Sequence, residues 1–306
     1  MSYAVLFSGQ GTQHPDMLPW LESEPASRAV LTALVDVVGN DWRAGLEVPQ
    51  QRSRNVFAQP LITGTALAAW AALASTLDAQ PVAVAGYSVG ELAAYSCAGV
   101  FDAQTAIALA ARRAELMDTA VAGVDTGLLS VSGMPSAQVL KAQPELECVI
   151  EIGAEQAIYA GEVSALLTSA QALSAMGALC KHLDVRLASH SHWMVSAARG
   201  FAAHLESVPF ARPHAAVVLN ATGASSRDPQ TLRLALATQV DHTVQWSACM
   251  DALAEQGVDC VIEVGAGATL SKMWNQRHPE IPARSLEEFR DVAGVVRWIQ
   301  RNARQG

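Results

Sequence analysis

VAVAGYSVGELAAYSCAG, residues 82–99, joins a strand pattern, a glycine-rich turn and a helix pattern without a spacer. The apolar run Val82 to Ala85 predicts a buried strand, and Glu91 to Cys97 follows a helical pattern. Gly86-Tyr87-Ser88-Val89-Gly90 between them has the spacing G-x-S-x-G, in which the serine lies on a strained turn and the glycines let strand and helix approach closely. The stretch predicts an α/β fold with Ser88 exposed at the tip of a sheet.

This turn also predicts chemistry. A serine held at the start of a helix can attack a carbonyl group, and the N–H of Val89 points to where the resulting oxyanion would form. The alternative is an ordinary serine in a glycine-rich turn. The strand before Ser88 and the helix after it favour the nucleophile.

Composition limits the classes of function. The chain has 306 residues, which predicts one large α/β body with a smaller inserted or appended unit. Its net charge of −9 argues against general affinity for nucleic acid or anionic lipid. The five cysteines stand singly, so we expect reduced thiols and no metal site. The longest apolar run is too short to span a membrane and the N-terminus lacks a signal-peptide pattern, so we expect a cytoplasmic protein without a membrane span.

Between residues 127 and 187 the predicted elements become shorter and alternate more closely. Short elements there predict the order strand, helix, strand, strand, helix, strand, which is the split βαβ arrangement of a ferredoxin-like subdomain; the strands are 128–131, 148–152, 157–160 and 180–185, and the helices 136–142 and 163–176. We therefore divide the chain into a catalytic body, residues 1–126 and 188–306, and an inserted subdomain, residues 127–187. Within the body, a long Ala/Leu helix is predicted from Pro60 to Leu77.

A serine nucleophile needs a base from elsewhere in the chain. His190 and His192 stand at the start of a predicted helix, where the chain returns from the insertion. An α/β-hydrolase would place an acid between the serine and the histidine in the sequence, but no carboxylate at a convincing strand end lies there. In the helix after residue 102, Arg112 and Arg113 point about 100° apart, so one can face inward while the other is solvated.

Five motifs in order resemble those of malonyl-CoA:acyl carrier protein transacylases. They are Gly9-Gln10-Gly11-Thr12-Gln13; Gly86-x-Ser88-x-Gly90-Glu91; Arg113 with Met117; Ser189-His190 with Met194; and Gln239 before Val244-Gln245-Trp246. The resemblance covers residues 7–270. It implies an α/β-hydrolase-like body with a parallel central sheet and an inserted ferredoxin-like subdomain, in agreement with the elements above.

The resemblance also implies roles. Ser88 would be the acyl-accepting nucleophile and His190 the base, with His192 out of register. The backbone N–H groups of Gln10 and Val89 would form the oxyanion hole. Arg113 would bind the malonyl carboxylate, and the main-chain carbonyl of Gln239 would support His190. No metal and no permanently bound cofactor are implied: malonyl-CoA is the acyl donor, and the prosthetic-group thiol of an acyl carrier protein is the acceptor.

Two departures from the family pattern refine the prediction. A tyrosine precedes the serine, and the family's Asn-rich turn is replaced by Ile152-Gly153-Ala154-Glu155-Gln156. The tyrosine and the chain length resemble the transacylase (epsilon) subunit of bacterial malonate decarboxylase, which we prefer here. The alternatives are a transacylase of fatty-acid synthesis, a serine thioesterase or hydrolase, and a silent scaffold that docks a carrier. For docking an acidic carrier we predict a basic rim of Lys181, Arg186 and Arg199.

Overall fold

A computed structural model describes residues 1–303. The helices are α1 Arg28–Val38, α2 Trp42–Glu47, α3 Pro49–Arg52, α4 Asn55–Ala74, α5 Gly90–Cys97, α6 Ala103–Ala120, α7 Ser136–Ala142, α8 Val163–Ala175, α9 Val195–Leu205, α10 Pro229–Thr238, α11 Trp246–Ala254, α12 Thr269–Arg277 and α13 Val292–Asn302. The strands are β1 Tyr3–Phe7, β2 Ala83–Gly86, β3 Thr126–Ser132, β4 Glu147–Gly153, β5 Gln156–Glu162, β6 Leu179–His182, β7 Ala216–Val218, β8 Ser225–Ser226, β9 Cys260–Val264 and β10 Ala283–Ser285.

The larger sheet has the order β10-β9-β1-β2-β7-β8, and all its pairings are parallel except that of β7 with β8. Side chains along β1 alternate between two cores: Tyr3, Val5 and Phe7 pack with helices α4, α5, α6 and α13, whereas Ala4 and Leu6 pack with α11 and α12. Helices therefore cover both faces, as a parallel sheet requires. The carboxyl ends of β1, β2 and β7 meet at one edge, where such sheets bind ligands.

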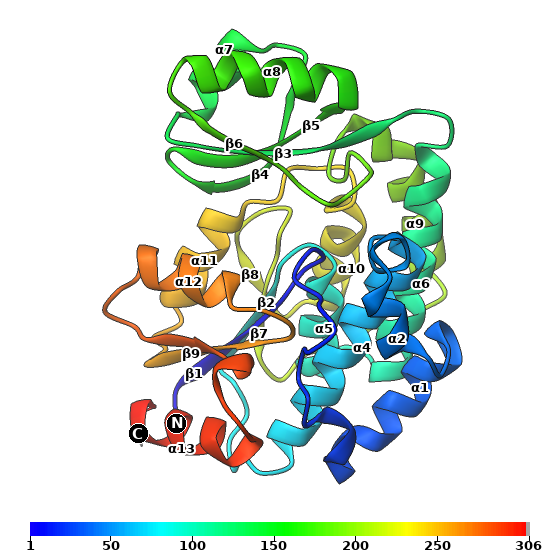
Figure 1. The fold of residues 1–306 in the computed structure, drawn as a ribbon. Helices are drawn as coiled ribbons and strands as arrows, with labels where there is room; N and C mark the ends of the chain where they lie inside the picture. The colour runs from blue at the N-terminus through cyan, green and yellow to red at the C-terminus, as the bar shows by residue number, and fades with distance from the viewer. Residues whose placement is uncertain (304–306) are drawn as a thin grey trace.

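The smaller sheet has the order β4-β5-β3-β6, with antiparallel pairs throughout. Figure 1 shows it with α7 and α8 at one end of the molecule, beyond the carboxyl edge of the larger sheet. One of its faces joins the body's core through Leu128, Ile150 and Ile158, and the bridge between Ile150 and Val244 joins the smaller sheet to the segment that precedes α11. This sheet and its helices confirm the predicted α/β fold class with an antiparallel second sheet. The domain limits drawn from the sequence stay a prediction.

Several predicted elements need correction. Helix α4 begins at Asn55, so Pro60 lies inside it rather than at its start. Burial of Phe57 and Gln59 stabilises the added turn despite the hydrogen bond that proline lacks. The strand predicted over 180–185 ends at His182, because Leu183 and Val185 turn to line a cavity. The short elements α3, β8 and β10 were not predicted.

Helix α4 is the one described helix that is long and apolar enough to cross a membrane. Within the fold 89% of its apolar stretch is buried, between the larger sheet and helices α1 and α6. Its apolar surface is thus used in the core of the body.

Candidate active site

Ser88 lies on the sharp turn between β2 and α5. Its φ of 55° is in the left-handed region, which a non-glycine residue adopts only when the surroundings hold it there. A Cβ on Gly86 would lie 2.1 Å from the carbonyl carbon of Gly90, so the turn requires glycine at that point. The amide oxygen of Asn220 accepts the N–H of Ser88 at 2.8 Å, and its Nδ2 donates to the carbonyl of Gly86 at 2.7 Å. These bonds fix the strained turn.

His190 faces Ser88 from the segment that returns from the smaller sheet. Its Nε2 lies 2.7 Å from Ser88 Oγ, and its φ of 62° is also left-handed. Of the three non-glycine residues with positive φ among residues 1–303, two are therefore this pair. Strained backbone conformations thus occur at both residues of the serine–histidine pair.

The other ring nitrogen of His190 contacts the main-chain carbonyl of Gln239 at 2.5 Å. A carbonyl oxygen only accepts, so Nδ1 carries the proton and Nε2 is left to accept the Ser88 hydroxyl. Burial, and then the charge of Arg113, lowers the pKa of His190 to about 3 despite the Gln239 carbonyl. The histidine is therefore neutral at ordinary pH, which is the state that a general base needs.

Arg113 enters the same space from α6 and is 1% exposed. Its guanidinium donates to Gln59 Oε1 at 2.8 Å and to Gln239 Oε1 at 3.0 Å, and Nη2 lies 3.4 Å from Ser88 Oγ. Burial lowers its pKa to about 10, so it keeps its charge at neutral pH. Its Nε has no hydrogen-bond partner among the described residues, which leaves one buried donor for a ligand. Arg112 is exposed and pairs with Glu115 instead.

The predicted oxyanion donors lie on either side of Ser88. Val89 precedes α5, and Gln10 lies on the loop after β1, where its side chain donates to Asn55 Oδ1 at 2.9 Å. Among residues 1–303, neither backbone N–H donates to another group of the chain. A Cβ on Gly9 would lie 2.5 Å from the carbonyl oxygen of Tyr87, so this loop and the serine turn touch only because residue 9 is glycine.

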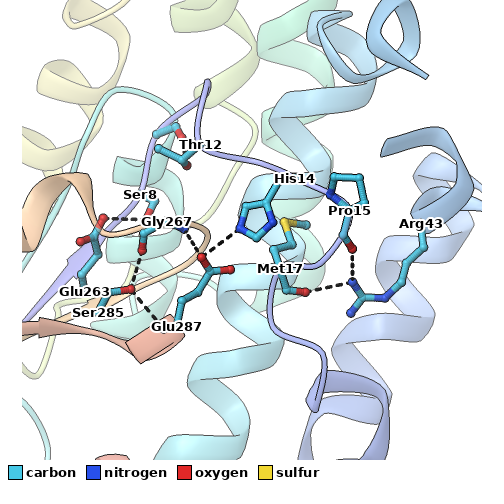
Figure 2. A network of polar contacts seen from close by, with 11 residues as sticks. Ser8, Thr12, His14, Pro15, Met17, Arg43, Glu263, Gly267, Ser285 and Glu287 are labelled. Carbon is cyan, nitrogen blue, oxygen red and sulfur yellow. Dashed lines mark hydrogen bonds and ion pairs between the residues drawn. The ribbon is translucent and has the colours of Figure 1, made fainter. Parts of the chain in front are cut away.

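Polar contacts hold the loop of Gln10 against the C-terminal part of the chain, as Figure 2 shows. Ser8 Oγ donates to Glu263 at 3.2 Å. Glu287 Oε2 accepts the N–H of Gly267 at 2.7 Å and lies 3.0 Å from His14 Nε2. Further along, Arg43 donates to the carbonyls of Pro15 and Met17. The segment on both sides of Gln10 is thus fixed.

Two neighbouring cavities, which share Gln10 and Tyr87 as lining residues, lie at the serine and beside it. The inner cavity, of about 50 Å³, is lined by Gln10, Ser88, Arg113 and His190 together with Gln59, Met117 and apolar residues. The outer cavity, of about 420 Å³, lies between the loop of Gln10, the start of α12 and the smaller sheet. Tyr87 lines both, with its ring packed edge-on against Trp246 at 5.0 Å.

Other predicted residues lie further from the serine. His192 is exposed, contacts Glu147 and stacks on Trp193. Lys181 lines the outer cavity, whereas Arg186 and Arg199 are exposed and line neither cavity. The turn that departs from the family pattern contributes Ile152 and Gln156 to the outer cavity. No group of three His, Cys, Asp or Glu side chains that could hold a metal occurs in the described part of the chain.

Three polar residues that contact the serine, arginine or histidine support were assigned no role from the sequence. Gln59 and Asn220 supply the side-chain contacts described above, and Glu91 is a fully buried carboxylate at the start of α5. Asn220 lies two residues after the buried strand β7, and Glu91 interrupts an Ala-rich helix. Polar residues at such apolar positions were the available signal.

A protein-family model described as the acyl transferase domain matches residues 5–304. The chain belongs to the acyl transferase domain family. A malonyl CoA-acyl carrier protein transacylase of Mycobacterium bovis is 33% identical over 298 residues, covering 94% of this chain and 97% of that protein.

Two solved structures of the same fold are similar over nearly their whole length. The malonyl-transacylase from Mycobacterium tuberculosis has a TM-score of 0.88 at 30% identity, with 97% of this chain and 100% of that chain covered. A complex of a type II polyketide synthase acyl-carrier protein with its malonyl-transacylase has a TM-score of 0.90 at 27% identity, with coverage of 97% and 99%. These matches confirm the resemblance to malonyl-CoA:acyl carrier protein transacylases that the sequence motifs predicted.

Proposed function

We propose that this chain transfers a malonyl group from malonyl-CoA to the thiol of an acyl carrier protein, through a malonyl ester on Ser88. The observation that carries the proposal is the content of one small cavity. It holds a serine hydrogen-bonded to a neutral histidine, and a buried guanidinium with an unpaired N–H. A nucleophile, a base and a carboxylate-binding group are thus within reach of one short acyl chain.

The first half-reaction uses the serine and histidine. As Ser88 Oγ attacks the thioester carbonyl, its proton passes to His190 Nε2, and the carbonyl oxygen becomes an oxyanion to which the N–H groups of Gln10 and Val89 can donate. The tetrahedral intermediate then expels the CoA sulfur, which takes the proton from His190. Attack by the carrier thiol on the Ser88 ester repeats these steps in reverse and regenerates the hydroxyl.

Arg113 supports malonyl as the acyl group. Only one methylene separates the carbonyl carbon of malonyl from its carboxylate, and the guanidinium lies 3.4 Å from the oxygen that carries the acyl group. A buried guanidinium binds a carboxylate through charge-assisted hydrogen bonds, which are about twice as strong as neutral ones. A simple thioesterase has no use for such a group beside its nucleophile.

The carrier follows from the outer cavity and from the relatives. That cavity is open to an extended thiol arm and leads to Ser88 past Tyr87. The relatives described above are named for acyl carrier protein. Their names support a transacylase of fatty-acid synthesis, which was an alternative prediction from the sequence, better than the malonate decarboxylase subunit, which was the preferred one. Tyr87 is the feature that favours the latter.

Intact-mass measurement after mixing the protein with malonyl-CoA tests the proposal. A malonyl adduct that persists until carrier is added is expected, and Ser88→Ala should show none. Rapid loss of the adduct to free malonate would instead indicate a thioesterase, and no adduct on the wild-type protein would contradict catalysis. Adding a fatty-acid carrier or a malonate decarboxylase carrier in separate reactions then identifies the acceptor by which one removes the adduct.

A further inference from the structure

Glu91 is the second residue of α5 and is fully buried directly behind Ser88. Each of its oxygens accepts one hydrogen bond: Oε1 from the backbone N–H of Asn220 at 2.8 Å, and Oε2 from Nε2 of Gln239 at 2.9 Å. Both partners are donors, so both oxygens are satisfied only when the group is an ionised carboxylate.

Its two partners are the residues that hold the reacting groups. The side chain of Asn220 accepts the N–H of Ser88, and Gln239 Nε2 donates to the carbonyl of Ser88 at 2.9 Å. The other end of the Gln239 amide accepts from Arg113, and its main-chain carbonyl accepts from His190. Glu91 lines neither cavity, yet its backbone N–H donates to the carbonyl of Ser88 at 3.0 Å and its carboxylate contacts both Asn220 and Gln239.

We propose that Glu91 is a positioning residue whose carboxylate fixes the Gln239 amide, and through it the arrangement of Ser88, His190 and Arg113. An amide has one donor end and one acceptor end. With Nε2 drawn toward Glu91, the acceptor end must face Arg113, as the structure has it. A glutamine at position 91 would turn an N–H toward either the Asn220 N–H or Gln239 Nε2, and the orientation of the Gln239 amide would then no longer be fixed. The inference rests on the proposed acyl transfer at Ser88.

Three charged or titratable groups face this carboxylate. They are Arg113 on α6, Tyr95 on the same helix and Cys249 on α11. Burial raises the pKa of Tyr95 and Cys249 well above their usual values, so both are neutral. Burial also raises the pKa of Glu91 to about 7, against the lowering by its two donors and by Arg113. Protonation below that pH would leave one donor without an acceptor.

The rate of acylation as a function of pH tests the proposal. Stopped-flow release of CoA from malonyl-CoA is measured between pH 5 and 9 for the wild-type chain and for Glu91→Gln. Protonation of Glu91 removes one of the two hydrogen bonds that its carboxylate accepts. Because a hydrogen bond to a charged group contributes about 1.5–3 kcal/mol, the wild-type rate constant should fall about tenfold as pH drops through the pKa of Glu91. Glu91→Gln should stay at the low plateau throughout, without the step. The pKa of His190 is too low to produce a step in this range.

A control for the loss of a buried carboxylate is Glu263→Gln: Glu263 is also fully buried and accepts N–H groups at the start of α12 and the hydroxyl of Ser8 beside the loop of Gln10. This variant should lose stability and should be slower at every pH, because the loop is loosened, but it should keep the step. Should Glu91→Gln fail to fold, Gln239→Met removes the amide that Glu91 holds and should abolish the same step. A wild-type rate and step in either Glu91→Gln or Gln239→Met would overturn the inference. A wild-type chain that malonyl-CoA does not acylate would instead refute the proposed function.

Discussion

Arg113→Ala is the substitution that most directly tests acyl selectivity. It removes a buried guanidinium that lies 3.4 Å from the nucleophile, and with it the only cation that lines the inner cavity among the described residues. Acetyl-CoA offers no carboxylate, so it should lose only the indirect contribution of Arg113 to the position of Gln239. Malonyl-CoA should lose that contribution and the direct contact as well.

The size of the effect follows from the contacts available. A hydrogen bond to a charged group contributes about 1.5–3 kcal/mol, and a carboxylate can take two from one guanidinium. With about 3 kcal/mol lost and about 1.4 kcal/mol per factor of ten, the ratio of kcat/KM for malonyl-CoA to that for acetyl-CoA should fall about a hundredfold. Arg113→Lys should restore only part of it, since an ammonium lacks the planar fork.

Malonyl-CoA and acetyl-CoA are both assayed on the same protein sample by CoA release, so the amount of folded protein cancels in the ratio of the two kcat/KM values. Arg112→Ala is the matched control, because that neighbour is exposed and pairs with Glu115 on the surface. The control should keep the wild-type ratio. Comparable rates for the two donors in the wild-type chain, or the same ratio in both variants, would refute the assignment of Arg113.

Three further predictions follow from the site. His190→Ala should reduce acylation by several orders of magnitude and His192→Ala should reduce it little, since only His190 contacts Ser88; equal losses measured by CoA release would contradict this. Because the pKa of His190 is lowered to about 3, the unfolded chain binds a proton between that pH and about 6.5 that the folded chain does not, so stability should fall as pH decreases through this window by up to about 1.4 kcal/mol per unit. The free energy of unfolding, measured with urea, should change less with pH between about 3 and 6.5 in His190→Ala than in the wild type, and an identical pH dependence would contradict the lowered pKa of His190. Reversing Lys181 and Arg186 to Glu should raise the KM for the acidic carrier and leave acylation by malonyl-CoA unchanged, and added salt should weaken wild-type carrier transfer; a carrier step indifferent to both would place docking elsewhere.

The sequence predicts the fold well where the signals are local. The run from Val82 to Cys97 carries its own strand, turn and helix patterns, and the six elements of the smaller sheet follow in the predicted order. Errors occur where tertiary packing decides. Pro60 is a plausible first residue of a helix, but burial of the preceding turn extends α4 back to Asn55. Strands of two or three residues, such as β8, have no pattern of their own and form only because a neighbour pairs with them.

The arrangement of the site depends on contacts between distant residues, which no local pattern contains. Ser88 and Gln239 are 151 positions apart, and the buried amide that joins them to Arg113 and Glu91 is visible only in three dimensions. Motif spacing supplied candidates for the nucleophile, the base and the guanidinium. It also assigned the main-chain carbonyl of Gln239 to the support of His190, but it assigned no role to the Glu91 carboxylate or to Asn220, because a single buried Glu or Asn has no spacing that indicates its contacts.

The carbonyl behind His190 explains why the sequence offers no acid for a triad. A carboxylate in the place of that carbonyl would support the histidine, but it would also lie near Arg113, whose charge acts on His190 and whose guanidinium lies 3.0 Å from the Gln239 side chain. The two charges would pair, and the positive charge that the proposed function uses for malonyl would be neutralised within the protein. A main-chain carbonyl fixes the ring with Nε2 toward Ser88 and carries no net charge. The buried carboxylate of Glu91 contacts the Nε2 end of the Gln239 amide, whereas the guanidinium of Arg113 contacts the oxygen end. Under the proposed function, binding of a dicarboxylic acyl group by Arg113 and support of His190 by a neutral acceptor therefore depend on the same residue, Gln239.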